Sequence, residues 1–301
     1  MELRDLKYFQ QVAQLGHFGR AAEAVHRTQP AVSKSVQRLE AEFEAELFTR
    51  EDGQLILTSV GRALLWHAQD ILNGMDAVRR DVKAVAKGAA GHVRLGVSAT
   101  AAEFLLPVLT SQLLPRFPDI TIEIELGMND YLAGALAQRS LDLVVAPYTQ
   151  TAGELEFARI AVDHVVVVAS REHPLFRQAR IKMRDLQAYR WVLPSKSGAT
   201  RKWLEQAFER RGLRRPAAQI ESNAISLIPR LISSTTLLSF ITRRNLHMEL
   251  LAKSVREIEL PETTMTRDFG VLYRPGGYSA PSVRSVLDIL LSQREAVGQY
   301  R

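Results

Sequence analysis

The sequence predicts an α/β protein in three parts: a small helical module at residues 1–58, one long helix over 59–87, and a larger domain over 88–301. Three observations support this. Apolar residues recur at helical spacing through the first forty residues, and a heptad-like apolar stripe runs through the next helix. From residue 92 onward, apolar strands alternate with helices, which indicates an α/β domain with a mostly parallel sheet.

Length and composition exclude several classes of protein. The chain has 301 residues, of which 46% are apolar and 24% charged, and it contains no cysteine. A disulfide framework, a thiolate zinc site and a cysteine nucleophile are therefore excluded. The N-terminus "MELRDLKYFQ" lacks the features of a signal peptide, and the longest apolar tracts are too short to span a bilayer. We expect a soluble, cytoplasmic protein with no membrane partner.

The net charge of the whole chain suits a nucleic-acid partner, but the charge of its N-terminal module does not. The net charge of +6 suits a polyanion. Residues 1–60, however, contain seven Lys and Arg against nine Asp and Glu, a net charge of −2. DNA binding by this module would therefore depend on which helix face carries the basic side chains.

The first two predicted helices form the start of a helix-turn-helix. The first carries a single apolar stripe and ends at Gly16, and the second covers Phe18–Val25, where alanines allow close approach of another helix. Only residues 26–28 connect it to a third helix, which is the helix-turn-helix signature. The glycine that is common in this turn is absent.

The third helix begins within "RTQPAVSKSVQRLE", residues 27–40. Thr28 is a good N-cap because its hydroxyl can accept a bond from a free N–H of the first turn. Pro30 then lies in that first turn, where its missing N–H costs little. Val32, Val36 and Leu39 repeat at i, i+4 and i+7 and are expected to face the core of the module.

The opposite face of this helix has amide, hydroxyl and cationic groups and no carboxylate. Gln can pair with adenine, Lys can reach guanine, and Ser and backbone N–H groups suit phosphates. The four acids of this region all follow that face. The alternative is a solvated face of a small helical bundle. The candidate DNA-binding residues here are Thr28, Gln29, Pro30, Ser33, Lys34, Gln37 and Arg38.

A hairpin is predicted directly after the three helices. "LFTREDGQLILTSVG" reads as a strand, a turn and a second strand, with Asp52-Gly53 as the turn and apolar alternation at Leu55 and Leu57. A hairpin in this place is a wing. We expect Arg50, at the base of the wing, to contact a minor groove or a phosphate.

The long helix begins at a cap from Thr58 or Ser59 and carries a stripe with 4-3 spacing over three heptads. Such a stripe is typical of a coiled-coil seam, and the alternative is a face that packs within its own domain. A two-fold dimer would present two reading helices to a pseudo-palindromic site. "KGAAG" at 87–91 is interpreted as a hinge. The predicted seam residues are Leu64, Ala68, Ile71, Met75, Val78, Val82 and Val85.

Three strand-to-helix turns of the large domain carry polar side chains, and helices are expected over 199–211 and 223–232. In α/β sheets, ligands bind at the carboxyl ends of strands beside helix N-termini. Helix capping is the alternative for any one turn, but the three turns together indicate a site for a small anion, with a carboxylate-bearing metabolite as the expected ligand. The candidate residues are Ser98, Thr100, Ser195, Ser197, Thr200, Arg201, Ser222 and Asn223.

The residue combinations that mark enzymes are not found in the sequence. It has no glycine-rich phosphate loop and no G-x-S-x-G elbow, and its seven histidines lack metal-type spacing. We therefore expect no catalytic activity, no metal and no cofactor. Two alternatives are an enzyme with a DNA-binding appendage and a module that stores or delivers a small anion.

The segment "LKYFQQVAQLGHFGRAAEAVHRTQPAVSKSVQRLEAEFEAELFTREDGQLILTSVGRALL" resembles the N-terminal domain of the LysR-type transcriptional regulators. Weaker agreement continues through "LGVSATAAEFLLPVL", "FPDITIEIELG", "LDLVVAP" and "HPL". The resemblance implies a winged helix-turn-helix, a linker helix that forms dimers, and a two-lobed effector domain like the periplasmic type 2 binding proteins. By match of position, it assigns major-groove contacts to Gln29, Pro30, Ser33 and Lys34, and the wing contact to Arg50.

The resemblance also implies an assembly and a mode of control. Such proteins form homodimers and homotetramers that bend double-stranded promoter DNA, with RNA polymerase as a further partner, and they respond to a small effector held between two lobes. Lobe I would comprise 92–162 and 268–301, lobe II 163–267, with crossover strands near 161–168 and 264–271.

Three positions depart from the family pattern. Met128 stands where a Ser or Thr often helps to hold the ligand, Ser140 replaces a usual glycine, and "SSTTLLSFI" replaces a glycine-rich segment. Because of these departures, the inducer of a particular family member is not carried over to this chain.

Overall fold

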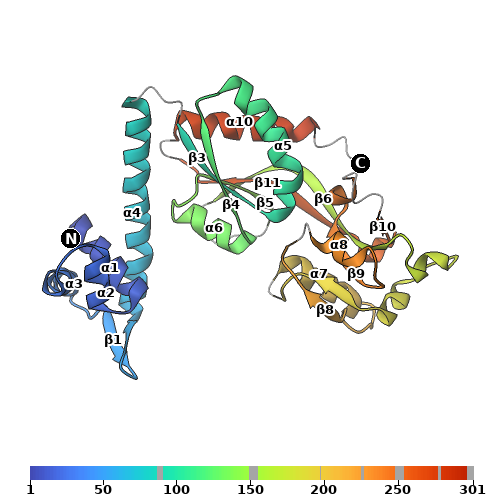
Figure 1. The fold of residues 1–301 in the computed structure, drawn as a ribbon, viewed down its shortest axis with the longest axis horizontal. Coiled ribbons are helices and arrows are strands. Elements are labelled where there is room, and N and C mark those ends of the chain that lie inside the picture. The colour runs from blue at the N-terminus through green and yellow to red at the C-terminus, as the bar shows by residue number, and fades with distance from the viewer. Residues whose placement is uncertain are drawn as a thin grey trace. The chain divides into compact units, whose positions relative to one another are not determined.

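The computed structural model describes residues 1–86, 91–148, 155–196, 198–224, 227–247, 254–276 and 279–296. The chain divides into two compact units, which are described separately: Met1–Ala89 with Ala137–Ser140, and Ala90–Leu136 with Leu141–Arg301 (Figure 1). The hinge expected at 87–91 lies outside the described residues except for Gly91. No helix in the described parts of the chain is both long and apolar enough to cross a membrane.

Three helices form the core of the first unit: α1 (Leu3–Leu15), α2 (Phe18–Ala24) and α3 (Gln29–Phe43). Their apolar stripes converge, so that Phe9, Val32 and Leu39 are fully buried, as the periodicity predicts. Gly16 ends α1 with φ +62° and donates its N–H to the carbonyl of Val12 at 2.9 Å.

The turn between α2 and α3 is made without glycine. His26 takes φ +52°, a conformation that favours glycine, while Arg27 donates its N–H to the carbonyl of Ala22 at 2.9 Å. Thr28 occupies the N-cap position of α3 with extended backbone angles, but its hydroxyl accepts no hydrogen bond from the first turn. The capping position was predicted correctly, and the capping bond was not.

The predicted wing is present as β1 (Phe48–Glu51) paired with β2 (Gln54–Leu57). Asp52 and Gly53 have φ +49° and +77°, the two positive angles of a type I′ turn. Arg50 lies opposite Leu55, one pair from the turn. It is therefore nearer the tip of the wing than its base, and the expectation that it lies at the base is wrong.

A single helix of 28 residues, α4 (Ser59–Ala86), follows the wing. Thr58 caps it, because its hydroxyl accepts the N–H of Gly61 at 2.9 Å. Gly61 is required by close packing, since a Cβ there would lie 2.1 Å from the carbonyl oxygen of Leu47.

The second unit is built on a nine-stranded sheet in its described residues, in the order β4-β3-β5-β11-β6-β9-β7-β8, with β10 paired to β6. The strands are β3 (His92–Val97), β4 (Thr121–Leu126), β5 (Leu143–Pro147), β6 (Glu156–Ser170), β7 (Trp191–Leu193), β8 (Ala218–Glu221), β9 (Leu238–Thr242), β10 (Val255–Glu257) and β11 (Met265–Tyr273). The outer strands pair in parallel, and β6 and β11 pair antiparallel at the centre.

Helices cover both faces of this sheet (Figure 1). They are α5 (Ala99–Arg116), α6 (Asn129–Ala137), α7 (Ala199–Glu209), α8 (Ile228–Ile232) and α10 (Pro281–Ala296). The short 3₁₀ turns are η1 (Pro174–Arg177), η2 (Met183–Ala188), η4 (Arg243–His247) and η5 (Pro261–Thr263). The helix predicted over 223–232 is shorter than expected, because α8 begins only at Ile228.

Strands β6 and β11 pass through two separate hydrophobic cores. Ile160 and Phe269 belong to the core beneath α5 and α10, whereas Val165 and Val167 belong to the core beneath α7, with Met265 packed against it. We call the parts around these cores lobe I and lobe II. The valine run of β6 is buried on both faces, which explains why it reads as a continuous apolar stretch.

A glycine-to-alanine exchange tests the packing of these central strands. Gly270 lies at a register shift in β11, and a Cβ there would lie 2.2 Å from the carbonyl oxygen of Ala158. We expect Gly270→Ala to lower the free energy of unfolding by about 1–3 kcal/mol, measured by chemical denaturation. The matched control is Gly134→Ala in α6, where the added Cβ meets no atom within 4 Å and stability should stay equal or rise. Equal denaturation midpoints for the two variants would contradict this packing.

Candidate nucleic-acid interface and effector site

The exposed face of α3 carries the polar residues that the periodicity placed there. Gln29, Pro30, Lys34 and Gln37 are exposed and Ser33 is half-buried, while the apolar stripe is buried against α1 and α2. Thr28 is exposed at the start of the helix, and its hydroxyl is not used as a cap. The face therefore offers hydroxyl, amide and ammonium groups to a partner, and no carboxylate.

Arg38 differs from the other predicted contacts because it has partners within the protein. Its guanidinium forms an ion pair with Asp5 of α1, and its Nη2 donates to the hydroxyl of Ser35 at 2.8 Å. The Asp5 side chain is almost fully buried, whereas 43% of the Arg38 side chain is exposed. Arg38 thus fixes α3 against α1, and a DNA contact would have to use the exposed part of its guanidinium.

The pKa of Asp5 reflects this ion pair. Burial alone would raise the pKa of the carboxyl group, but the hydrogen bonds from Arg38 and Ser35 outweigh burial, and the pKa falls below its ordinary value. The carboxylate is therefore charged in the folded protein at neutral pH.

The stripe along α4 divides into two parts. Ala68 is fully buried in the core of the helical module and Leu64 is half-buried against it, so these two positions pack within their own domain. Further along, Ile71, Val78 and Val82 are exposed, the last two by 58% and 62%. Met75 is half-buried, and the side chain of Val85 lies outside the described residues. The exposed part of the stripe has the character of an unpaired seam.

In lobe I, the turn after β3 is a helix cap. Ser98 accepts the N–H of Ala101 with its hydroxyl at 3.3 Å, and both Ser98 and Thr100 are buried. In lobe II, the hydroxyl of Ser222 accepts the N–H of Ala224 at 3.2 Å. The capping alternative therefore describes Ser98, whereas Ser222 closes a local turn and does not cap α8, whose N-cap is Leu227.

Two other predicted residues are brought together in lobe II. The amide oxygen of Asn223 accepts the N–H of Ser195 at 3.0 Å, so the turns after β7 and β8 are joined. The methyl group of Met128, from lobe I, lies 4.0 Å from where a Cβ on Gly198 of lobe II would be. Ser197 lies outside the described residues. The turn after β7 therefore adjoins lobe I, as expected for a site between two lobes.

Arg201 does not offer a free charge to an acid. Its side chain is buried, and it forms ion pairs of 2.9 Å with both Glu205 and Glu221. It also donates to the carbonyl of Pro194 at 2.9 Å. The structure thus corrects the expectation that Arg201 would hold a carboxylate ligand: it fixes α7 to the ends of β7 and β8.

The crossover strands carry a polar network that the sequence did not predict. Asp163 of β6 is fully buried and lies opposite Arg267 of β11, whose Nε donates to its carboxylate at 2.8 Å. Thr242 bonds the same carboxylate, and Arg267 also donates to the hydroxyl of Thr200 at 3.0 Å. The sequence feature that could have indicated this network is the single aspartate directly before the apolar run in "DHVVVVAS".

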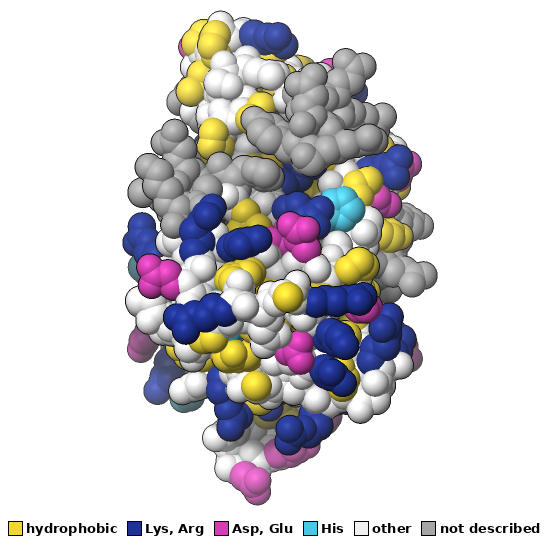
Figure 2. Space-filling model, turned by 90° about the vertical axis from the view of Figure 1, so that its right-hand side faces the viewer, with side chains coloured by type: hydrophobic (Ala, Val, Ile, Leu, Met, Phe, Trp, Pro, Cys, Tyr) yellow, Lys and Arg dark blue, Asp and Glu magenta, His cyan; other side chains and the backbone are white. Residues whose placement is uncertain are grey.

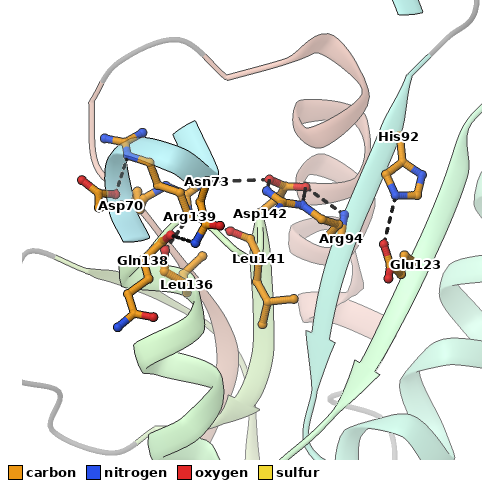
Figure 3. A network of polar contacts seen from close by, with 11 residues as sticks. Asp70, Asn73, His92, Arg94, Glu123, Leu136, Gln138, Arg139, Leu141 and Asp142 are labelled. Carbon is orange, nitrogen blue, oxygen red and sulfur yellow. Dashed lines mark hydrogen bonds and ion pairs between the residues drawn. The ribbon is translucent and has the colours of Figure 1, made fainter. Parts of the chain in front are cut away.

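A second network ties together the sheet of lobe I (Figure 3). The carboxylate of Asp142, which precedes β5, accepts from the backbone N–H of Arg94 at 2.8 Å and pairs with its guanidinium at 2.7 Å. Arg274 donates to the carbonyls of Leu136 and Leu141 at 2.6 and 2.7 Å. These bonds give "LDLVVAP" a structural role, separate from the effector turns.

A winged helix-turn-helix with an exposed polar helix, joined in sequence to a two-lobed α/β domain, defines the class of ligand-responsive transcription regulators. Two family models match this chain: "Bacterial regulatory helix-turn-helix protein, lysR family" over residues 3–62, and "LysR substrate binding domain" over 86–295. The chain belongs to the LysR family of transcriptional regulators and is a DNA-binding regulator with an effector-binding domain.

Individual relatives agree with this assignment. A RuBisCO operon transcriptional regulator from Allochromatium vinosum is 27% identical over 297 residues, which cover 97% of this chain and 96% of that protein. The fold is similar to that of full-length CbnR complexed with its target DNA, with a TM-score of 0.70 at 20% identity, covering 97% of this chain and all of that one. The effector domain of QuiR in complex with shikimate covers 69% of this chain and 99% of its own, with a TM-score of 0.60 at 19% identity.

The Asp5–Arg38 pair predicts a pH-dependent contribution to stability. Because the pKa of Asp5 is lowered in the folded state, the pair stabilises the protein above the unfolded-state pKa of about 3.9, and this stabilisation is lost as pH falls through the folded-state value. We expect Asp5→Asn to lower the midpoint of thermal unfolding by a few degrees at pH 7, with a deficit that shrinks below about pH 4. Asp76→Asn, on the exposed side of α4, is the control. A deficit for Asp5→Asn that does not change with pH would contradict the ion pair.

Proposed function

We propose that this regulator reads promoter DNA with the exposed face of α3 and that a small organic anion between its lobes controls the reading. The observation that carries the proposal is the face itself, which is polar, exposed and free of carboxylates in a module of net charge −2. The domain limits that we propose are 1–58 for DNA binding, 59–87 for the linker and 88–301 for the effector domain.

The proposed DNA contacts follow from the chemistry of each side chain. Gln29 and Lys34 would contact base edges in the major groove, and Ser33 would bond a phosphate. Arg50, exposed near the tip of the wing, would reach the backbone or the minor groove. The remaining proposed contacts are Thr28, Pro30, Gln37 and the exposed part of Arg38.

A homodimer with two-fold symmetry would place two copies of these contacts on a symmetric DNA site. We propose that the exposed part of the α4 stripe, from Ile71 to Val82, pairs with a second copy of the chain. Homodimers would associate further into homotetramers and act on RNA polymerase at the promoter. The exposed Val78 and Val82 support this pairing, because burying their apolar surface against a second helix would stabilise the dimer.

The effector is proposed to be a small organic anion held by neutral donors. Helix α5 begins two residues after the end of β3, and α7 begins six residues after the end of β7. The N-terminal N–H groups of both helices favour negative charge. Thr200, Ser195 and Asn223 would add hydrogen bonds. As mechanism, the ligand would close the lobes and shift the population between two assemblies that favour different DNA bends. We propose no catalytic activity, in line with relatives named as regulators.

The reading face is tested by removing two of its side chains. We expect Gln29→Ala with Lys34→Ala to weaken binding to a specific site by about 1–3 kcal/mol for each lost base contact, measured by fluorescence anisotropy at fixed salt. The matched control removes the same two residue types from α1, with Lys7→Ala and Gln14→Ala, both exposed. If both pairs weakened binding equally, or if neither did, α3 would not be the reading helix.

The seam is tested by placing charge on its exposed part. Val78→Lys with Val82→Lys should convert the dimer to monomer at micromolar concentration, because four lysines would face one another across the two-fold axis. Light scattering after size exclusion measures the mass. Asp76→Lys, outside the stripe, should leave the oligomer unchanged. An oligomer that is unaffected by the valine changes would place the interface elsewhere.

The charge of the effector is tested by comparing acids with neutral analogues. Titration of small organic acids into the full chain, at constant ionic strength, should show at least one that binds, while its primary amide binds at least about tenfold more weakly because it carries no charge. Equal affinity for acid and amide would show that the ligand is recognised without its charge.

A further inference from the structure

A cavity of about 300 Å³ lies at the N-terminal ends of β7 and β8 in lobe II. Residues 187–191 and 214–217 form its wall, with Phe208 of α7. The turns proposed to hold the effector, after Leu193 and Glu221, lie at the opposite ends of the same two strands. Because a strand rises about 3.3 Å per residue, the cavity is roughly 10 Å from those turns. It is therefore distinct from the effector site.

The cavity is cationic. Arg190, Arg214 and Arg215 line it, and its lining contains no Asp or Glu. Arg215 is paired with Glu209 at 2.5 Å, whereas Arg190 and Arg214 are exposed and form no ion pair with any described carboxylate. Two guanidinium groups at the cavity thus remain free to bind an anion.

The rest of lobe II also carries a net positive charge. Residues 163–267 contain nineteen Lys and Arg against ten Asp and Glu, a net charge of +9 that exceeds the +6 of the whole chain. Figure 2 shows Lys and Arg side chains gathered on the side of the molecule that carries lobe II. Such a field raises the local concentration of anions.

An unpaired buried donor belongs to the same cavity wall. Trp191 is fully buried and packs edge-on against Phe208, with ring centroids 6.0 Å apart. Its indole Nε1 is buried and has no hydrogen-bond partner among the described residues. The Nε1 atom itself is inaccessible, but the residue lines the cavity, so its N–H signal would report on a ligand bound there.

We propose that this cavity is a second ligand site, which binds a small oxyanion with two or more anionic oxygens. The oxygens would pair with the guanidinium groups of Arg190 and Arg214, beside the indole ring of Trp191. Guanidinium forks fit phosphate and carboxylate equally well, so both sources share this chemistry. The volume limits the ligand to a small molecule. The site does not depend on the proposed effector between the lobes.

The test follows the indole N–H signals of the full chain, labelled with ¹⁵N in its three tryptophans, by NMR. Trp191→Phe identifies the signal of Trp191. Pyrophosphate and citrate, titrated separately at constant ionic strength, distinguish the phosphate from the carboxylate source. We expect at least one of them to move the Trp191 signal to saturation, while the signals of Trp66 and Trp203 stay in place.

Paired variants locate the charge that holds the ligand. Arg190→Ala with Arg214→Ala should weaken binding at least about tenfold. Arg177→Ala with Arg180→Ala removes the same charge from exposed positions of lobe II that do not line the cavity, and should change affinity less than twofold.

Three results would overturn the proposal. The first is a Trp191 signal that neither anion moves. The second is equal weakening by both pairs of substitutions, which would indicate diffuse attraction by lobe II. The third is a Trp191 signal that responds to a short DNA duplex and to neither anion, which would make this face a nucleic-acid contact.

Discussion

The antiparallel pairing of β6 with β11 is the constraint on which the effector domain depends. Each strand contributes residues to the cores of both lobes, so the lobes are joined by a continuous stretch of sheet. Any change in the angle between them must be absorbed by the few residues between Ala161 and Val165 and those opposite them on β11. The buried Asp163–Arg267 pair lies at this place. Removing one partner of such a pair leaves an uncompensated charge, which makes the pair costly to break.

This arrangement offers a physical route from ligand to conformation. Arg267 donates to the hydroxyl of Thr200, which lies in the first turn of α7 beside the proposed effector site. A ligand that bonded to Thr200 would compete with Arg267 for that hydroxyl. The crossover strands would then respond directly to occupancy, which is what the proposed lobe closure requires.

In the DNA-binding module, buried side chains fix the position of the exposed polar face of α3. The apolar stripe of α3 and the Asp5–Arg38 pair fix the helix against α1, and the wing is fixed by its two-residue turn. The acids of the module do not interrupt the polar face. One of them, Glu40, accepts the N–H of Leu47 at 3.0 Å and so helps to connect α3 to the wing. The net negative charge of this module is therefore compatible with a polyanionic partner.

What could be predicted from the sequence was local and periodic. The three helices, the Asp52-Gly53 hairpin, the cap at Thr58 and the alternation of the α/β domain all depend on neighbours within a few residues. Two of the contacts that the sequence did not indicate join distant residues. The Arg201–Glu221 and Asp163–Arg267 ion pairs span 20 and 104 positions, and no local pattern predicts them. His26 adopts a positive φ, which residues other than glycine take uncommonly, and no pattern in the sequence marks this turn.

We propose that one protein joins site-specific DNA binding to the sensing of a small acid. Footprinting of the purified chain on the DNA that flanks its own gene, with and without a panel of small organic acids, tests both parts of this proposal. We expect protection of an interrupted palindrome that one acid shortens or shifts. The absence of protection at moderate salt, together with tight binding of an acid to the free protein, would contradict it and favour a protein that only stores the acid.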